Sequence, residues 1–469
     1  MTAQIRHAPQ FDSRELWRKD HDHFLHPFTH FPTFEKDGAL VITEGDGAYV
    51  FDGDGKRYLD GIAGLWCVNI GHGNGEIADT LAEQARRLAF FNTFVDVTNP
   101  PAAELAAKLA ELAPANLNRV FFDTGGSGAN DTTVRTIHYY FNRLGMPSKK
   151  KLISRVGAYH GSSYLTMTLT GLEEDHAGFD LPTDLVHYVS NPNPYRRPEG
   201  VTVDEFCDQL LDEFEAKILE VGPENVAAFF AEPILGAGGV IVPPPGYHRR
   251  TQEVCRQYGV LYVSDEVVTG FGRLGHMFAS EPAFGLQPDV ITCAKGLTSG
   301  YLPLGASIFS DEIYEVVSRP DPDLEWFNHG FTYSGHALCC AAALKNIEII
   351  ERERLCEHVR EVGPYLEERL ASLRDLPLVG DVRGSGFMRC VESVADRQTR
   401  ELLPASVEIG KRVSDHCEQR GLIGRPLGHL NVISPPLILT RGQIDELVDI
   451  LGQSIRATAD DLVREGVWR

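Results

Sequence analysis

Residues 118–144 read NRVFFDTGGSGANDTTVRTIHYYFNRL, and this stretch indicates how the chain folds. The apolar run that ends at Phe122 is typical of a buried strand, and the residues after the glycines have helical spacing. Between them lies the run GGSG at 125–128. Glycines let a backbone approach a ligand closely, and the N–H groups of a helix start point toward an anion. The stretch therefore predicts a strand, a phosphate-binding turn and a helix.

The same alternation of strand and helix continues on both sides of this unit. Helical patterns cover 76–89, 101–113, 128–144, 203–221 and about 247–258. Short runs rich in β-branched and aromatic residues cover 118–122, 151–156, 226–232, 260–266, 289–294 and 306–310. Strands separated by helices favour right-handed crossover units and a mainly parallel sheet. We therefore predict an α/β fold whose functional side chains lie at the carboxyl ends of the strands.

The domain organisation follows from where this alternation starts and stops. Residues 75–335 form the predicted large domain, which contains all the strand–helix units. Residues 1–74 contain a small antiparallel meander at 39–60, and residues 336–469 have an α+β pattern. In that last part the pattern predicts long helices after residue 336, another at 405–420 and a closing helix from about 441. We expect both ends of the chain to form a smaller α+β domain together.

The bulk properties exclude several classes of function. The chain has 469 residues and a formal net charge of -22, which disfavours nucleic-acid and anionic-membrane partners. No secretory signal is visible, and the most apolar stretch, 226–246, is broken by Glu232, glycines and prolines, so no membrane span is expected. The nine cysteines form no C-x-x-C pair, and the histidines at 21–30 lack a ligand pattern. We expect a cytoplasmic protein with no metal site.

Four features lie at or just beyond the carboxyl ends of predicted strands and share one kind of chemistry. They are the turn at 124–128, Tyr159 in AYHGSS, Asp265 in VLYVSDE and Lys295 in CAKGLTSG. A desolvated lysine can form an imine with a carbonyl group. Pyridoxal 5'-phosphate needs such a lysine, a phosphate cradle, a carboxylate for its pyridine nitrogen and an aromatic face for its ring. The combination predicts this cofactor.

Competing interpretations of the glycine-rich turns fit less well. A P-loop requires Ser or Thr after Gly-Lys, and neither Lys56 nor Lys411 is followed by one. The runs GHGNG at 71–75 and GAGG at 236–239 do not match a dinucleotide fingerprint. A serine hydrolase with Ser127 as its nucleophile would lack the last glycine of its motif and would leave the lysine and the acid unexplained.

The chain resembles the class III pyridoxal-phosphate aminotransferases of the ω-amino acid:pyruvate (amine:pyruvate) type over nearly its whole length. The matching stretches are HPFT (26–29), YLDGIAGLWCVNIGHG (58–73), FFNTF (90–94), AYHGSS (158–163), AEPILGAGGVIVPP (231–244), VSDEVVTGFGRLG (263–275), PDVITCAKGLTSGYLPLGA (288–306), FNHGFTYSGHALCCAAAL (327–344), VRGSGFM (382–388) and GRPLGHLNVISPPL (424–437). The resemblance implies the fold-type I architecture. It also implies a homodimer, with a tetramer as an alternative, whose active sites lie between subunits.

The resemblance implies a set of cofactor contacts. Lys295 resembles the Schiff-base lysine, which also carries the proton during catalysis. Asp265 resembles the acid that pairs with the pyridine nitrogen. The remaining contacts are Val267 on the ring face opposite Tyr159, Gly126 and Ser127 at the phosphate, and Thr332, which reaches the phosphate from the neighbouring subunit.

The resemblance also implies a substrate pocket and an activity. Phe28, Trp66, Phe90 and Phe91 resemble its aromatic wall, and Ala237 resembles a small residue within it. Arg425 resembles a mobile arginine that holds the carboxylate of a keto acid or amino acid. The implied activity is ping-pong transfer of an amino group from an amine or ω-amino acid to an α-keto acid, most simply pyruvate. A related decarboxylase, an aminomutase and a non-catalytic protein of this fold are alternatives, and the amine stays unidentified.

The phosphate turn departs from the usual family pattern N-S-G-S-E-A-N-D. This chain has Thr124, Gly125 and Gly128 where the family has asparagine, serine and glutamate. A glycine inside a helix costs roughly 0.5–1 kcal/mol relative to alanine. We therefore expect a looser cradle that retains the cofactor less tightly.

Overall fold

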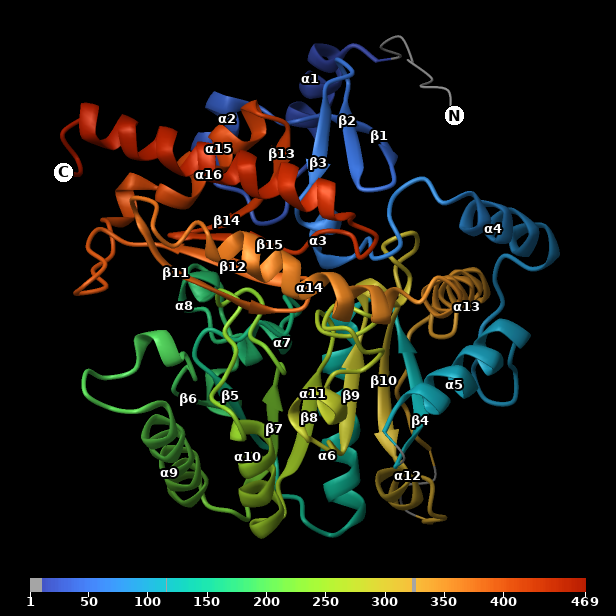
Figure 1. Ribbon diagram of the computed structural model, residues 1–469. Helices are drawn as coiled ribbons and strands as arrows, with labels where there is room; N and C mark the ends of the chain where they lie inside the picture. The colour runs from blue at the N-terminus through green and yellow to red at the C-terminus, as the bar shows by residue number, and fades with distance from the viewer. Residues whose placement is uncertain (1–10, 115, 323–325) are drawn as a thin grey trace.

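A computed structural model describes residues 11–114, 116–322 and 326–469. A seven-stranded sheet in the order β4-β10-β9-β8-β7-β5-β6 forms its centre (Figure 1). The strands are β4 (Leu117–Asp123), β5 (Lys151–Arg155), β6 (Val186–Val189), β7 (Val226–Ala231), β8 (Leu261–Asp265), β9 (Val290–Cys293) and β10 (Gly305–Ser310). Only β10 runs against its neighbours. The predicted α/β fold with a mainly parallel sheet is confirmed.

Helices cover both faces of this sheet. Successive side chains of a strand point to opposite faces, so Phe230 of β7 packs toward one helical layer and Phe229 toward the other. The first layer contains α6 (Gly126–Arg143) and α12 (Asp311–Val317), and the second contains α9 (Val203–Val221) and α10 (Tyr247–Gln257). Every residue of β7 is buried, as expected of a parallel strand covered on both sides.

A third helical group lies beside the β4–β10 edge (Figure 1). It contains α4 (Gly75–Arg87), α5 (Pro100–Leu112) and α13 (Ala337–Arg352), and both α4 and α5 pack against α13. The next helix, α14 (Leu355–Ala371), and the closing helix, α16 (Arg441–Arg464), share the same hydrophobic core. These five helices connect the central sheet to the terminal parts of the chain.

Two small sheets contain the strands from both ends of the chain. One has the order β1-β2-β3-β13 and the other β11-β12-β15-β14. Their strands are β1 (Ile42–Asp46), β2 (Tyr49–Asp52), β3 (Arg57–Asp60), β11 (Val379–Ser385), β12 (Met388–Ser393), β13 (Leu422–Ile423), β14 (Arg425–Leu427) and β15 (Leu430–Ile433). Because β13 pairs with β3, the two ends share a sheet. The domain boundaries after residues 74 and 335 stay predictions.

The shorter elements show where the sequence patterns were insufficient. The predicted helix at 405–420 is wrong in part: a 3₁₀ turn (Ala405–Val407) precedes α15 (Ile409–Gln419), because Glu408 adopts a left-handed φ of 49°. The strand β6 was not predicted. The remaining helices are α1 (Ser13–His23), α2 (Phe31–Asp37), α3 (Ala63–Trp66), α7 (Thr166–Leu169), α8 (Glu173–His176) and α11 (Ser280–Phe284), with 3₁₀ turns at Thr183–Leu185, Pro194–Arg196 and Lys295–Leu297. None of the described helices is both long and apolar enough to span a lipid bilayer.

Candidate active site

The four predicted site features lie at one edge of the central sheet. Strands β4, β5, β8 and β9 run in the same direction, so their carboxyl ends meet there (Figure 1). The glycine-rich turn follows β4, and Tyr159 follows β5. Asp265 ends β8 opposite Thr292 of β9, and Lys295 lies three residues beyond Thr292. The acid and the lysine therefore come from adjacent parallel strands.

The turn before α6 has the properties of an anion-binding helix start. Helix α6 has 18 residues, and no side chain caps its amino end. Its first N–H groups are therefore left for an external acceptor. A Cβ atom on Gly126 would lie 3.0 and 3.1 Å from the two methyl carbons of Val267, so only glycine allows this approach without a shift. This arrangement of donors fits a phosphate group.

Ser127 connects this turn to the loop after β5. Its Oγ accepts a hydrogen bond from the N–H of Ser162 over 3.1 Å. The hydroxyl hydrogen remains available for another acceptor, such as a phosphate oxygen. A Cβ on Gly161 would lie 2.5 Å from Ser127 Oγ, and Gly161 has a φ of 129°, so this position requires glycine for two reasons.

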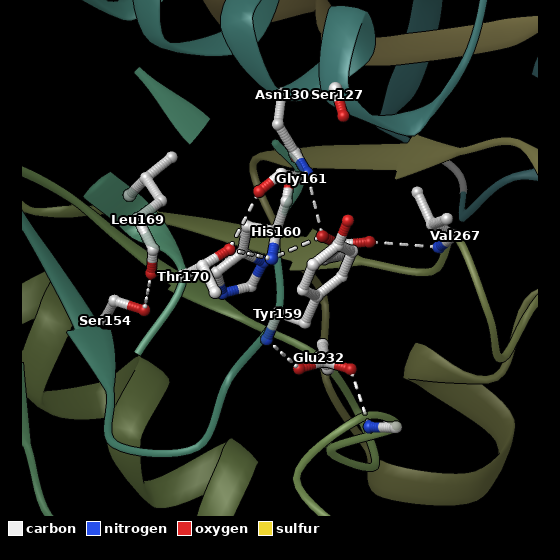
Figure 2. A network of polar contacts seen from close by, with 12 residues as sticks. Ser127, Asn130, Ser154, Tyr159, His160, Gly161, Leu169, Thr170, Glu232 and Val267 are labelled. Atoms are coloured by element: carbon white, nitrogen blue, oxygen red, sulfur yellow. Dashed lines mark hydrogen bonds and ion pairs between the residues drawn. The ribbon is translucent and has the colours of Figure 1, made fainter. Parts of the chain in front are cut away.

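Asp265 is the centre of a buried hydrogen-bond network, and its partners His160, Asn130 and Val267 are labelled in Figure 2. Its Oδ2 accepts from His160 Nδ1 and from Asn130 Nδ2, each over 2.8 Å, and its Oδ1 accepts from the N–H of Val267 over 3.1 Å. Burial disfavours the ionised form, but the bonds from His160, Asn130 and Val267 outweigh it and lower the pKa of Asp265. The site therefore contains a fixed anion suited to a protonated ring nitrogen.

A second buried acid, Glu232, positions two loops. It accepts from the N–H of Tyr159 over 3.0 Å and from the N–H of Gly236 over 2.7 Å (Figure 2). Burial raises its pKa. The carboxyl group thus fixes the loop of the predicted stacking ring and the loop that contains Ala237.

Sequence reasoning missed three residues of these networks, namely Asn130, His160 and Glu232. Asn130 and His160 lie within the quoted motifs GGSGAND and AYHGSS. Glu232 is a single acid inside the apolar stretch 226–246. A lone acid in such a stretch is a usable signal, because a buried carboxyl group needs hydrogen-bond donors.

Lys295 lies in a strained turn, and its side-chain amine forms no hydrogen bond or ion pair with any described residue. Its φ of 45° is unusual for a residue with a side chain, and strain of this kind concentrates at functional sites. Asn346 Nδ2 holds the turn by donating to the carbonyls of Gly296 and Leu297 over 2.8 and 2.9 Å. The amine of Lys295 is therefore positioned by the backbone and remains free to react.

The predicted aromatic wall divides into two groups. Phe28 is exposed but contacts the ring of Tyr159 edge-on, with centroids 6.3 Å apart, and Trp66 is buried after β3. Phe90 instead packs against Tyr333 and His336, and it is exposed together with Phe91. Thr332 is exposed in this second group. The described contacts join Phe90 to segment 333–336 and not to the loop of Tyr159.

Arg425 begins β14 and approaches the first group from one of the small sheets. Tyr159 and Asp175 are its charged or titratable neighbours, and burial lowers its pKa. Its guanidinium forms no hydrogen bond or ion pair within the described residues. A half-buried guanidinium without a partner is suited to a carboxylate ligand. Ala237 is partly buried in the loop after β7.

One cavity of the described residues lies away from these groups. It has a volume of about 920 Å³ at the amino end of β4 and is lined by residues of β4, α6 and α12, by residues 318–322 and by Phe327. None of the predicted site residues lines it. We assign the chemistry to the strand ends, because the polar groups and the lysine converge there. Within the described ranges, no group of three or more His, Cys, Asp or Glu side chains could hold a metal ion.

Comparisons with known proteins identify what this arrangement is similar to. The family model for class-III aminotransferases matches residues 33–455. The putrescine–pyruvate aminotransferase of Pseudomonas aeruginosa is 42% identical over 98% of this chain and 99% of its own. The diaminobutyrate–2-oxoglutarate transaminase of Halomonas elongata is also 42% identical, over 97% and 98% of the two chains.

Solved structures give the same result. An (S)-enantioselective ω-transaminase from Thermomicrobium roseum superimposes with a TM-score of 0.92 at 42% identity, covering 96% of this chain and 99% of that one. The ω-transaminase of Pseudomonas jessenii in complex with PMP superimposes with a TM-score of 0.93 at 40% identity, covering 96% and 99%.

Proposed function

Because the chain belongs to the class-III aminotransferases and is therefore a pyridoxal-phosphate-dependent enzyme that transfers amino groups, we propose that it moves the amino group of a primary amine or ω-amino acid to pyruvate. The relatives at about 40% identity are transaminases, which favours amino-group transfer over the decarboxylase, the aminomutase and the non-catalytic protein. One observation carries the proposal. Lys295, whose amine has no partner, and the anionic Asp265 lie at the ends of neighbouring strands.

The residues present fit the cofactor. The uncapped start of α6 and the hydroxyl of Ser127 provide donors for a phosphate. Asp265 provides the anion for a ring nitrogen, while Tyr159 and Val267 provide surfaces for the ring. When bound, the cofactor supplies an electron-withdrawing ring that makes the hydrogen on the substrate's amino-bearing carbon acidic.

The chain's own groups would handle protons and substrate binding. Lys295 Nζ takes the proton from the amino-bearing carbon of the donor and returns a proton in the second half of the reaction, so it must be uncharged when it acts as the base. Arg425 holds the carboxylate of pyruvate. Phe28 and Trp66 line the donor side, and Ala237 leaves room for the donor's chain.

We also propose that the enzyme is a homodimer in which Phe90, Phe91 and Thr332 complete the site of the second copy. The support is the exposed apolar surface formed by these segments. Its exposed members are Phe90, Phe91, Phe94, Val95, Trp326, Phe327, Phe331 and Tyr333. Exposed apolar side chains gathered on neighbouring segments are typical of a subunit interface. Sedimentation should give twice the chain mass of 51.9 kDa.

Mixed dimers test the shared site directly. When Lys295→Ala and Thr332→Ala subunits are combined, one site of each mixed dimer contains both native residues. We expect mixing to restore transaminase activity that neither variant has at low cofactor concentration. If no activity appears although mixed dimers form, Thr332 acts within its own subunit.

Cytoplasmic location is part of the same proposal. All nine cysteines are unpaired, which suits a reducing compartment.

A donor panel tests the reaction. Putrescine, 4-aminobutyrate, β-alanine, taurine and an aralkylamine are each incubated with the holoenzyme and pyruvate, and alanine is measured. We expect alanine to form with at least one donor. If 2-oxoglutarate supports turnover and pyruvate does not, the acceptor assignment is wrong, although the enzyme remains an aminotransferase.

A further inference from the structure

Asp123, the last residue of β4, is a buried acid that the proposed reaction does not use. Its side chain is 0% exposed. A Cβ on Gly128 would lie 3.1 Å from Asp123 Oδ1 and 3.2 Å from Asp123 Cβ. The carboxyl group therefore packs against the first turn of α6, directly below the phosphate cradle. The glycine that was expected to loosen the cradle instead provides room for this acid.

Hydrogen bonds connect Asp123 to the segment that contains Thr332. Thr132 Oγ1 donates to Asp123 Oδ1 over 3.1 Å, and it lies 2.8 Å from His329 Nε2. A threonine hydroxyl has a single hydrogen, so His329 must donate to Thr132 from Nε2. The ring of His329 stacks on Phe121 with centroids 5.2 Å apart. Asp123, Thr132 and His329 thus tie the start of α6 to segment 329–332.

No positively charged group that faces Asp123 among the described residues would stabilise its ionised carboxylate. Its Oδ2 has no hydrogen-bond partner among the described residues. From α6 it faces Asp131, a like charge, while Arg135 acts on Asp131 and His329. Burial, with a smaller contribution from Arg135, lowers the pKa of His329 to about 4, so this ring is neutral. Strand β10, which pairs with Asp123 through Gly305, has no titratable side chain.

The same surroundings favour the protonated acid. Burying an unpaired carboxylate is far more costly than burying a neutral carboxyl group. Burial raises the pKa of Asp123 to about 7. The hydrogen bond from Thr132 lowers this pKa, and the nearby negative charge of Asp131 raises it further. A phosphate at the start of α6 would add a further negative charge.

We propose that Asp123 is a further positioning residue of the cofactor-phosphate site, and that tight cofactor binding requires its carboxyl group to be uncharged. This inference rests on the proposed location of the phosphate at the start of α6. An uncharged Asp123 leaves the positive end of the helix dipole to the phosphate, whereas an ionised one competes for it. Cofactor retention should therefore weaken as the pH rises through the pKa of Asp123.

The test compares the wild type with Asp123→Asn, which keeps the shape of the protonated acid. Equilibrium dialysis of each holoenzyme against pyridoxal phosphate gives a Kd at each pH from about 6 to 9. The ratio of wild-type to variant Kd should be constant at low pH and then rise by up to about tenfold per pH unit above about pH 7. The ratio cancels the titration of the cofactor and of Lys295, which both proteins share.

A second readout counts protons. Calorimetric titration at about pH 8 in two buffers of different ionisation enthalpy gives the number of protons taken up as the cofactor binds. The wild type should take up more protons than Asp123→Asn, by up to one. A flat Kd ratio together with equal proton uptake would overturn the inference.

Matched variants on α6 control for charge and folding. Asp131→Asn removes a like charge, so it should shift the loss of affinity to lower pH and keep its slope. Thr132→Val removes the bond that lowers the pKa of Asp123, so it should shift the loss to higher pH. If Asp123→Asn does not fold, the pH at which Thr132→Val loses affinity still tests the inference. A shift of that pH to lower values would overturn it.

Failure of the proposed function would look different. If the wild type bound no pyridoxal phosphate at any pH, the cofactor site itself would be misplaced. If binding were normal but its pH dependence were the same in both proteins, only the role of Asp123 would be lost.

Discussion

A methyl group added at Gly126 tests the geometry of the phosphate cradle. The new Cβ in Gly126→Ala would lie 3.0 and 3.1 Å from the methyl carbons of Val267, whereas carbon atoms prefer about 3.5–4.0 Å. The two residues must separate by roughly 0.5 Å. Val267 is 8% exposed, and its N–H donates to Asp265 Oδ1 over 3.1 Å. A shift of that size away from Asp265 takes this bond beyond hydrogen-bonding distance.

The expected cost follows from these contacts. If Val267 stays in place, overpacking costs about 1–3 kcal/mol. If it moves, the lost bond to a charged group costs about 1.5–3 kcal/mol. The part of this free-energy cost that exists without the cofactor lowers the Tm, and the rest of the cost weakens cofactor binding. We expect the Kd for pyridoxal phosphate to rise by about 5- to 100-fold, which corresponds to about 1–3 kcal/mol.

Equilibrium dialysis measures the Kd, and thermal unfolding measures the stability. Gly125→Ala is the matched control, because a Cβ there has nothing within 4 Å and the φ of 169° suits any residue. The double variant Gly126→Ala/Val267→Ala removes the clashing methyl groups and should bind the cofactor as well as Val267→Ala alone. If Gly126→Ala kept the wild-type Kd and Tm, or if Gly125→Ala were equally damaging, the described packing of the cradle would be wrong.

Three further predictions concern single residues. Lys295→Ala should retain the cofactor but lose turnover, and borohydride should no longer fix the cofactor to the protein; normal turnover would refute its role. Arg425→Ala should raise the KM for pyruvate by about 10- to 100-fold, the equivalent of a charge-assisted hydrogen bond. It should leave the KM for a carboxylate-free amine nearly unchanged, and an equal rise for both substrates would contradict carboxylate binding. Gly128→Glu should weaken cofactor binding, because its side chain meets Asp123; adding Asp123→Ala should relieve this loss, and dialysis of both variants decides.

The strand ends were predictable from the sequence, because apolar runs define strands and parallel strands present their carboxyl ends at one edge. Lys295 and Asp265 each follow such a run directly, so their meeting required no knowledge of side-chain packing. The reversed direction of β10 and the break of the predicted 405–420 helix at Glu408 were not predictable in this way. Both depend on backbone conformations that hydrophobic periodicity does not encode.

The partners of the site residues could not be predicted, since they lie far away in the chain. His160 and Asn130 bind an acid 105 and 135 residues later. Such pairs depend on how strands are ordered within the sheet, and that order is a property of the folded chain.

The sequence by itself determined the fold class and the cofactor, and it identified Lys295 as the candidate reacting lysine, because each of these follows from local patterns of apolar, glycine and charged residues. Only the tertiary structure decided what the glycines at the phosphate turn do. From the sequence, Gly128 was a weak point in a helix. In the structure it faces Asp123 of the preceding strand, because the end of β4 and the first turn of α6 pack side by side. Tertiary contacts, rather than helix propensity, therefore determine the structural role of Gly128.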